Sequence, residues 1–93
     1  MIENNYCIGN SQAENNAYDG IFIDDYSHYN NIRRNMVWWG AYDYPTNQQR
    51  YGINIASATC WSNQIVNNRL DKSGVSGGLN DLGTNTVVEN NML

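Results

Sequence analysis

The chain has 93 residues, with nine acidic and five basic side chains that give a formal net charge of −4 at pH 7. The five scattered cations form no stripe that could neutralise phosphates, so the composition excludes nucleic acid as a partner. No apolar run approaches the roughly 20 residues of a membrane span, and the first ten residues lack a secretion signal. Cys7 and Cys60 stand in no metal or redox spacing, so we expect two small buried side chains and no metal site.

Asparagine occupies 17 positions and often occurs in pairs, such as Asn4-Asn5, Asn67-Asn68 and Asn90-Asn91. Its side chain disfavours helix interiors and strands, tolerates left-handed turns and bonds to neighbouring backbone groups. The aliphatic residues between the pairs recur regularly, which a solvated low-complexity tract would not need. The composition therefore predicts short apolar strands joined by frequent turns.

One motif recurs along the chain: an aliphatic residue, two free positions, asparagine, one free position and an apolar residue. Its copies begin 30, 33 and 23 residues apart, and they are Ile2-Asn5-Cys7, Ile32-Asn35-Val37, Ile65-Asn68-Leu70 and Val88-Asn91-Leu93. A second element, Gly-Ile-x-Ile, precedes the two middle copies at residues 20–23 and 52–55. Alternation followed by an Asn-bearing turn predicts strand–turn–strand units and no long helix. In chain order, the segments between these elements are a polar loop at 8–19, an aromatic loop at 38–51 and a Gly/Ser-rich loop at 71–77.

Units of this size cannot close a hydrophobic core alone, so we expect them to stack as coils. Equivalent aliphatic residues would then lie about 4.8 Å apart in apolar ladders. The asparagines of the motif are expected to point inward and to bond to the amides of the coils above and below. This structural ladder consists of Asn5, Asn35, Asn68 and Asn91.

The stretches GIFIDDYSHYNNIRRNMV, YGINIASATCWSNQIVNNRL and GGLNDLGTNTVVENNML resemble the repeats of the pectin-lyase-like superfamily. The resemblance implies an all-β fold, a right-handed parallel β-helix (solenoid) of about three to four coils without recognisable end caps. Residues 1–93 would form a single β-helix segment, a fragment of a longer solenoid. The resemblance also implies a polysaccharide as partner, and a location outside the cell or on the surface of a cell or virion.

The resemblance leaves open whether the chain is an enzyme. Asp24-Asp25 is similar to the paired acid of polygalacturonases, but the Gly-His-Gly and Arg-Ile-Lys motifs of those enzymes are absent. In a polysaccharide lyase, calcium held by acidic residues would act together with a base that takes a proton; otherwise no cofactor is expected. Asp24, Asp25 and Arg33 are the candidate catalytic residues. The alternative is that both aspartates cap the turn after residues 21–23.

Aromatic side chains are concentrated in the loop of residues 38–51. Sugar rings stack on Trp and Tyr, while Asp and Arg bond to hydroxyl and carboxylate groups. The candidate glycan-binding residues are Trp38, Trp39, Tyr42, Tyr44, Asp43 and Arg50. The alternative is that the tryptophans pack on the flank of the coils.

Two functions are therefore expected from the resemblance and from the aromatic loop. The first is a polysaccharide-associated segment that binds glycan or serves as a scaffold. The second is part of a polysaccharide lyase, a glycoside hydrolase or a phage tailspike depolymerase, with catalytic residues partly outside this chain. In either case, open strand edges at the ends of the stack predict self-association of the chain.

Overall fold

A computed structural model describes residues 1–8, 10–11, 14–38 and 48–93 of the chain, and its regular elements in these ranges are all β-strands. Each strand is short because a turn follows within a few residues. The strands are β1 (Ile2–Glu3), β2 (Tyr6–Ile8), β3 (Ile21–Ile23), β4 (Asn31–Arg33), β5 (Met36–Trp38), β6 (Tyr51–Ile55), β7 (Gln64–Val66), β8 (Gly77–Asp81) and β9 (Val87–Glu89).

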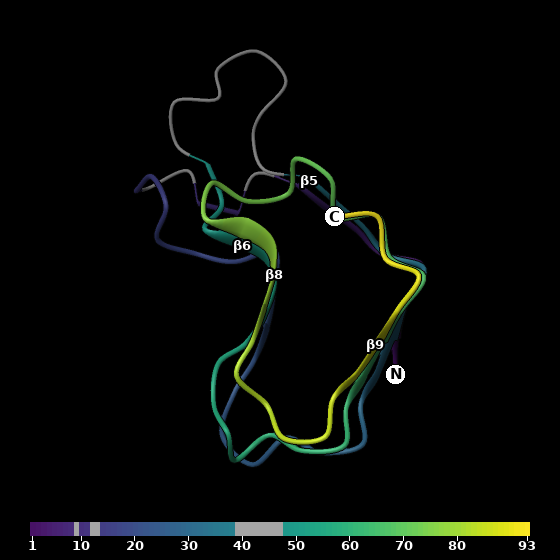
Figure 1. Cartoon of the computed structure of the whole chain (residues 1–93). Helices are drawn as coiled ribbons and strands as arrows, with labels where there is room; N and C mark the ends of the chain where they lie inside the picture. The colour runs from purple at the N-terminus through teal and green to yellow at the C-terminus, as the bar shows by residue number, and fades with distance from the viewer. Residues whose placement is uncertain (9, 12–13, 39–47) are drawn as a thin grey trace.

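The strands pair in parallel in three sheets, with the orders β1-β4-β7-β9, β2-β5 and β3-β6-β8. Successive coils add their strands to the same sheets, so the coils superpose when the molecule is viewed along the stacking axis (Figure 1). The register places Ile32 between Ile2 and Ile65, and Ile65 beside Val88. The predicted all-β fold, a right-handed parallel β-helix, is thereby confirmed.

Aliphatic columns fill the interior of the coils. In β3, for example, Ile21 and Ile23 are buried, whereas Phe22 between them points outward and is exposed. The core is formed by residues of this kind from several coils, namely Ile21, Ile23, Ile32, Val37, Ile53, Ile55, Cys60, Ile65 and Leu70. A single coil would leave these side chains in water, so the stability of the fold depends on stacking.

The glycine of the Gly-Ile-x-Ile element allows close approach between coils. A Cβ atom at Gly52 would overlap the side chain of Ser73 and the carbonyl oxygen of Gly78 in the next coil. One at Gly20 would likewise overlap Val37 and the carbonyl oxygen of Gly52. The recurrence of glycine at this position therefore has a packing cause.

The residue before each ladder asparagine adopts the left-handed backbone conformation, with φ of 58° at Asn4, 55° at Arg34, 59° at Asn67 and 53° at Asn90. This conformation turns the chain between two strands of a coil. Asparagine tolerates it better than most other residues with a side chain. The Asn-Asn pairs at these corners therefore combine a turn residue with a ladder residue.

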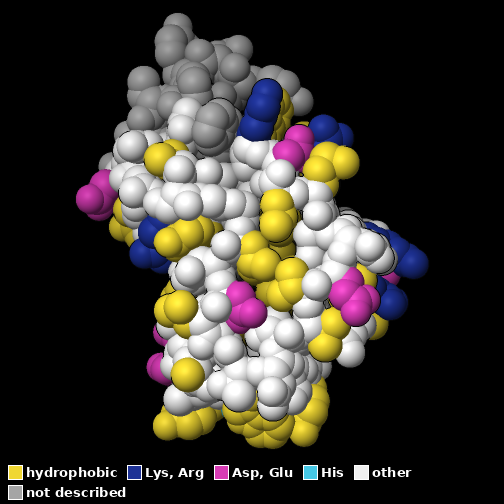
Figure 2. Space-filling model, viewed as in Figure 1, with side chains coloured by type: hydrophobic (Ala, Val, Ile, Leu, Met, Phe, Trp, Pro, Cys, Tyr) yellow, Lys and Arg dark blue, Asp and Glu magenta, His cyan; other side chains and the backbone are white. Residues whose placement is uncertain are grey.

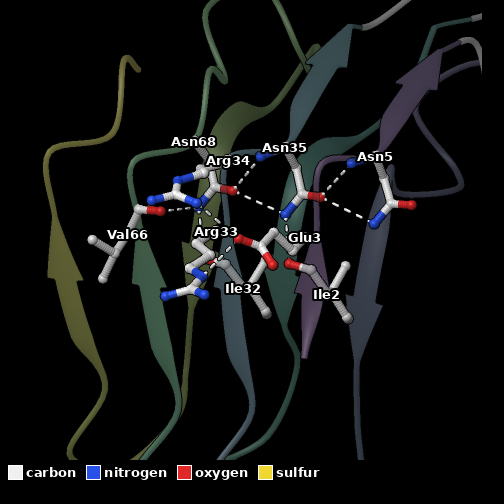
Figure 3. A network of polar contacts seen from close by, with 9 residues as sticks. All are labelled: Ile2, Glu3, Asn5, Ile32, Arg33, Arg34, Asn35, Val66 and Asn68. Carbon is white, nitrogen blue, oxygen red and sulfur yellow. Dashed lines mark hydrogen bonds and ion pairs between the residues drawn. The ribbon is translucent and has the colours of Figure 1, made fainter.

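A column of side-chain amides runs through the coils at this corner, and Figure 3 shows its first three members, Asn5, Asn35 and Asn68. The backbone N–H and Nδ2 of Asn35 both donate to Oδ1 of Asn68, each over 3.0 Å. Asn5 donates in the same way to Asn35, over 3.0 and 3.1 Å, and Asn68 to Asn91, over 2.9 and 3.0 Å. Nδ2 of Asn35 and of Asn68 also donates to a backbone carbonyl of the preceding coil. The neighbouring coils thus satisfy the buried amides.

Two further columns show the same pattern, in which the N–H and side-chain amide of one residue donate to a side-chain oxygen of the next coil. At a second corner, the N–H and Nδ2 of Asn30 donate to Oδ1 of Asn63, over 2.9 and 3.0 Å. At a third, the same groups of Asn10 donate to Oε1 of Gln49, over 3.3 and 2.9 Å, and Nε2 of Gln49 donates to the carbonyl of Ser73. In all three columns a side-chain oxygen accepts two hydrogen bonds from the residue of the preceding coil.

Replacing Asn68 with alanine is expected to lower the free energy of unfolding by about 3 kcal/mol, because two donors of Asn35 lose their acceptor in the interior. The same change at Asn91 is expected to cost about 1 kcal/mol, since water can reach the last coil. Urea titrations followed by circular dichroism measure both values. Equal losses in the two variants would contradict a ladder that is buried in the middle and solvated at its end.

Candidate functional site

A polar network centred on Asp19 lies beside the β3-β6-β8 sheet, on its outer face. The carboxylate accepts bonds from Nε and Nη2 of Arg50, over 3.0 and 2.6 Å, and from the backbone N–H of Tyr51 over 3.1 Å. Nδ2 of Asn54 donates to it over 3.0 Å, and Oδ1 of Asn54 in turn accepts a bond from Nδ2 of Asn80. Strands β6 and β8 place these partners, because residues 54 and 80 are register neighbours.

Only 2% of the Asp19 side chain is exposed, whereas 36% of the Arg50 side chain remains accessible. Burial by itself would raise the pKa of Asp19. The hydrogen bonds from Arg50, Asn54 and Tyr51, together with the guanidinium charge, outweigh burial and lower the pKa of Asp19 below its usual value. The carboxylate is therefore held in its charged form and its pair with Arg50 is bidentate.

A shallow pocket of about 410 Å³ adjoins this network. Its lining residues are Phe22, Arg50, Tyr51, Asn54, Ala56, Asn80 and Leu82. The amides can exchange hydrogen bonds with a bound molecule, but the one charged group, Arg50, is already neutralised by Asp19. The pocket lining therefore offers a bound molecule two side-chain amides, the Tyr51 side chain and an ion-paired guanidinium.

The corner between β3 and β4 holds the histidine of the chain. The rings of His28 and Trp61 stack with centroids 4.0 Å apart and planes 26° apart, and Tyr29 meets Trp61 edge-on at 4.9 Å. Nδ1 of His28 is buried and has no hydrogen-bond partner among the described residues. The ring nitrogens of a stacked imidazole lie in its plane, so they do not face Trp61. Among the described residues, this corner therefore presents one buried ring nitrogen and no converging group of metal ligands.

The candidate catalytic residues occupy separate structural positions. The carbonyl of Asp24 accepts a bond from the Ser27 hydroxyl over 2.6 Å, and Asp25 has a left-handed φ of 38°, so both belong to the turn after β3. Arg33 lies on β4, where its Nε bonds to Oε1 of Glu3 over 3.1 Å. Within the described ranges, no ion pair joins Arg33 to either aspartate.

Two of the six candidate glycan-binding residues can be placed. Trp38 ends β5 and lines a pocket of about 200 Å³ together with Met36, Val37, Arg69, Asp71 and Lys72. Arg50 belongs to the Asp19 network on the outer face of the β3-β6-β8 sheet. Trp39, Tyr42, Asp43 and Tyr44 lie outside the described residues.

The three parallel sheets and their amide columns define the chain as a β-helical solenoid protein. Over residues 1–93 the sequence matches the family of periplasmic copper-binding proteins (NosD), and the chain belongs to this family. No curated protein and no solved structure matches the chain. The described residues include no helix that could cross a membrane.

Family membership corrects the expected function. The family is described by copper binding and not by the binding or degradation of polysaccharide, so both polysaccharide hypotheses were wrong. The repeat specifies how coils pack, and one fold carries many activities, so the resemblance could not separate them. The expectation that no metal is involved is not confirmed, because the family description names copper. The expected location, outside the cell or on the surface of a cell or virion, agrees only coarsely with the word periplasmic, which places the family on the envelope side.

Copper sites in proteins are built from converging imidazole, thiolate or thioether groups. The side chains of this kind in the sequence are His28, Cys7, Cys60, Met1, Met36 and Met92. All of them are described, and no three His, Cys, Asp or Glu side chains of the described residues are grouped to hold a metal ion.

The sulfur ligands are also separated by the coil architecture. Met36 and Met92 share one column, but Arg69 pairs with both and lies between them. Burial raises the pKa of the Cys7 thiol, which disfavours the thiolate that binds metals. Cys60 is fully buried in the core. These residues do not fit a copper site with several ligands.

Sequence reasoning missed the Asp19 network and the amide columns at the other two corners. Asp19 and Arg50 are 31 residues apart, about one coil, so their contact follows from the stacking period. Asn30 and Asn63 are 33 residues apart, and the same period relates them. The stacking period therefore relates both pairs, although Asp19 and Arg50 belong to no repeated motif.

Replacing Asp19 with asparagine is expected to lower the free energy of unfolding at pH 7 by about 2 kcal/mol, because Arg50 loses its charged partner. The pKa of Asp19 is lowered by folding, so its stabilising contribution is present above the unfolded pKa and is lost as the pH falls through the folded pKa. Between pH 7 and pH 3 the parent should therefore lose more stability than the variant.

The control is Asp71→Asn, which removes the partner of Arg69 in an exposed ion pair. Exposed pairs contribute little, so this change is expected to cost less than about 1 kcal/mol. Chemical denaturation at several pH values measures both variants. An Asp19 variant that follows the parent at every pH would show that the network does not stabilise the fold.

Proposed function

We propose that this chain serves as a β-helical scaffold within a periplasmic copper-binding protein, and that its described residues form no multi-ligand copper site. The observation that carries the proposal is the separation of the potential copper ligands. Met36 and Met92 lie on either side of Arg69, and His28 offers a single buried nitrogen. The scaffold role is supported by the three amide columns, which tie each coil to the next.

A scaffold of this kind presents its loops and outer faces at fixed positions. The Asp19 network fixes the outer face of the β3-β6-β8 sheet, and Glu3 binds both Arg33 and Arg34 beside β1 and β4. A relationship to the pectin-lyase-like superfamily forms part of the proposal, and it concerns the coil architecture alone. The proposed location is the periplasm, in accordance with the family description.

Copper dialysed against the chain in the presence of a competing chelator is expected to stay with the chelator, for Cu(I) and for Cu(II) alike. The physical reason is that one imidazole cannot replace the several ligands that the chelator supplies. Equilibrium dialysis followed by atomic absorption measures the copper retained by the parent and by His28→Ala. One equivalent of copper on the parent and less on the variant would overturn the proposal.

A further inference from the structure

The outward face of the β3-β6-β8 sheet buries polar side chains that the alternation of the strands directs toward water. Phe22 and Asn54 are register neighbours on this face, because the isoleucines on either side of each point into the core. Phe22 is 54% exposed, yet only 4% of Asn54 and 2% of the Asp19 side chain are accessible. Nδ2 of Asn54 donates to the Asp19 carboxylate over 3.0 Å. The outer face of the sheet therefore holds a desolvated polar cluster.

This cluster differs from the amide columns, which join the coils through residues that repeat. The pair of Asp19 and Arg50 belongs to no recurring motif. A buried ion pair is often no more stabilising than apolar side chains of similar volume, so stacking alone does not account for it. The bidentate contact, over 3.0 and 2.6 Å, does fix the position of the guanidinium against the sheet. Polar groups held rigidly in this way are what a binding site requires.

The groups fixed by the network retain hydrogen-bonding capacity. Arg50 binds Asp19 through Nε and Nη2, and its Nη1 has no acceptor among the described residues. Nδ2 of Asn80 donates to Oδ1 of Asn54 over 2.9 Å, whereas Oδ1 of Asn80 accepts no bond from the described part of the chain. Arg50, Asn54 and Asn80 all line the pocket of about 410 Å³. Its lining therefore carries both donors and an acceptor.

Apolar side chains complete the lining of this pocket. Phe22 and Leu82 are both more than half exposed, and the guanidinium carbon of Arg50 lies 5.6 Å from the centroid of the Tyr51 ring. Figure 2 shows basic and hydrophobic side chains on this flank of the molecule, beside the place that β6 and β8 occupy in Figure 1. An exposed aromatic ring and a pair of amides are thus brought together.

The pocket does not depend on the ends of the stack. Its polar residues point outward from the sheet, and β6, which carries Asn54, lies between β3 and β8. A coil added at either end would place a strand beside β3 or β8 and would leave the outward face of β6 open. The pocket is therefore a feature of the sheet itself.

We infer that this pocket binds an uncharged molecule whose planar ring carries an amide or lactam edge. Asn80 presents a donor and an acceptor on one group, and such an edge presents the complementary pair. The exposed ring of Phe22 offers a face for stacking. Arg50 is already neutralised by Asp19, so an anionic ligand gains little from the guanidinium. The volume of about 410 Å³ is that of a small-molecule site.

This ligand is separate from copper, and its binding does not rest on the scaffold role. Benzamide, benzoate and cyclohexanecarboxamide are suitable probes, since they are similar in size and differ in charge or in the planarity of the ring. Proton–nitrogen correlation spectra of the full chain follow each titration through the side-chain amide signals of Asn54 and Asn80. Benzamide is expected to bind with a Kd on the order of 1 mM, as its small size dictates. It should bind about fivefold more tightly than either other probe, because benzoate brings an unmatched charge and a cyclohexane ring stacks poorly.

Variants of the lining test which groups carry the binding. Asn80→Ala and Phe22→Leu are each expected to weaken benzamide binding by about fivefold, since one removes the amide and the other the aromatic face. The matched control is Gln64→Ala, which removes an exposed amide from the outward face of the β1-β4-β7-β9 sheet and should leave binding unchanged. Dispersed amide signals show that each variant is folded before its affinity is compared.

Asp19→Asn supplies a second readout, because it leaves the guanidinium of Arg50 without its counter-charge. In this variant the preference should shift toward benzoate by about tenfold. An unchanged preference in this variant would overturn the inference. So would the absence of saturable shifts with benzamide, binding of benzoate or cyclohexanecarboxamide to the parent as tight as that of benzamide, or equal affinities of the Asn80 and Gln64 variants for benzamide.

Discussion

A buried side-chain amide must find partners for its hydrogen bonds, and in this fold the partners lie on other coils. Asn35 shows the constraint most fully, because its N–H and Nδ2 reach Asn68 while its Oδ1 accepts from Asn5. An amide left without these bonds would cost the free energy of its desolvation. The bonds exist only when the coils stack in one register. Packing of the aliphatic columns and satisfaction of the amides therefore require the same arrangement.

The same constraint separates the residues that build the fold from those that can serve a function. The asparagines of the columns use their side-chain amides to bond to neighbouring coils. The carboxylate of Asp19 is likewise bound by Arg50. Membership of the periplasmic copper-binding family then raises the question of where copper is held. In the described part of this chain the soft ligands are dispersed. This dispersal supports the proposed role of the chain as a scaffold.

The fold could be predicted from the sequence because stacking repeats its signals in every coil. The spacing from Ile2 to Ile32 and from Ile32 to Ile65 already gives the register of three strands. The site could be predicted only in small part, since Asp19 and Arg50 each occur in one coil and belong to no motif that recurs in the other coils. The function could not be predicted, because the resemblance rested on residues such as Gly52 that are fixed by packing. A signal that reports packing carries little information about the ligand.

Hydrogen exchange of the asparagine side-chain amides, resolved by NMR, tests the amide column most directly. The Nδ2 protons of Asn35 and Asn68 lie in the interior and bond to neighbouring coils, whereas the side chains of Asn67 and Asn90 are exposed at the corners. Slow exchange is predicted for the first pair and fast exchange for the second. Equal, fast exchange of all four side chains would contradict the claim that the amide columns hold the coils together.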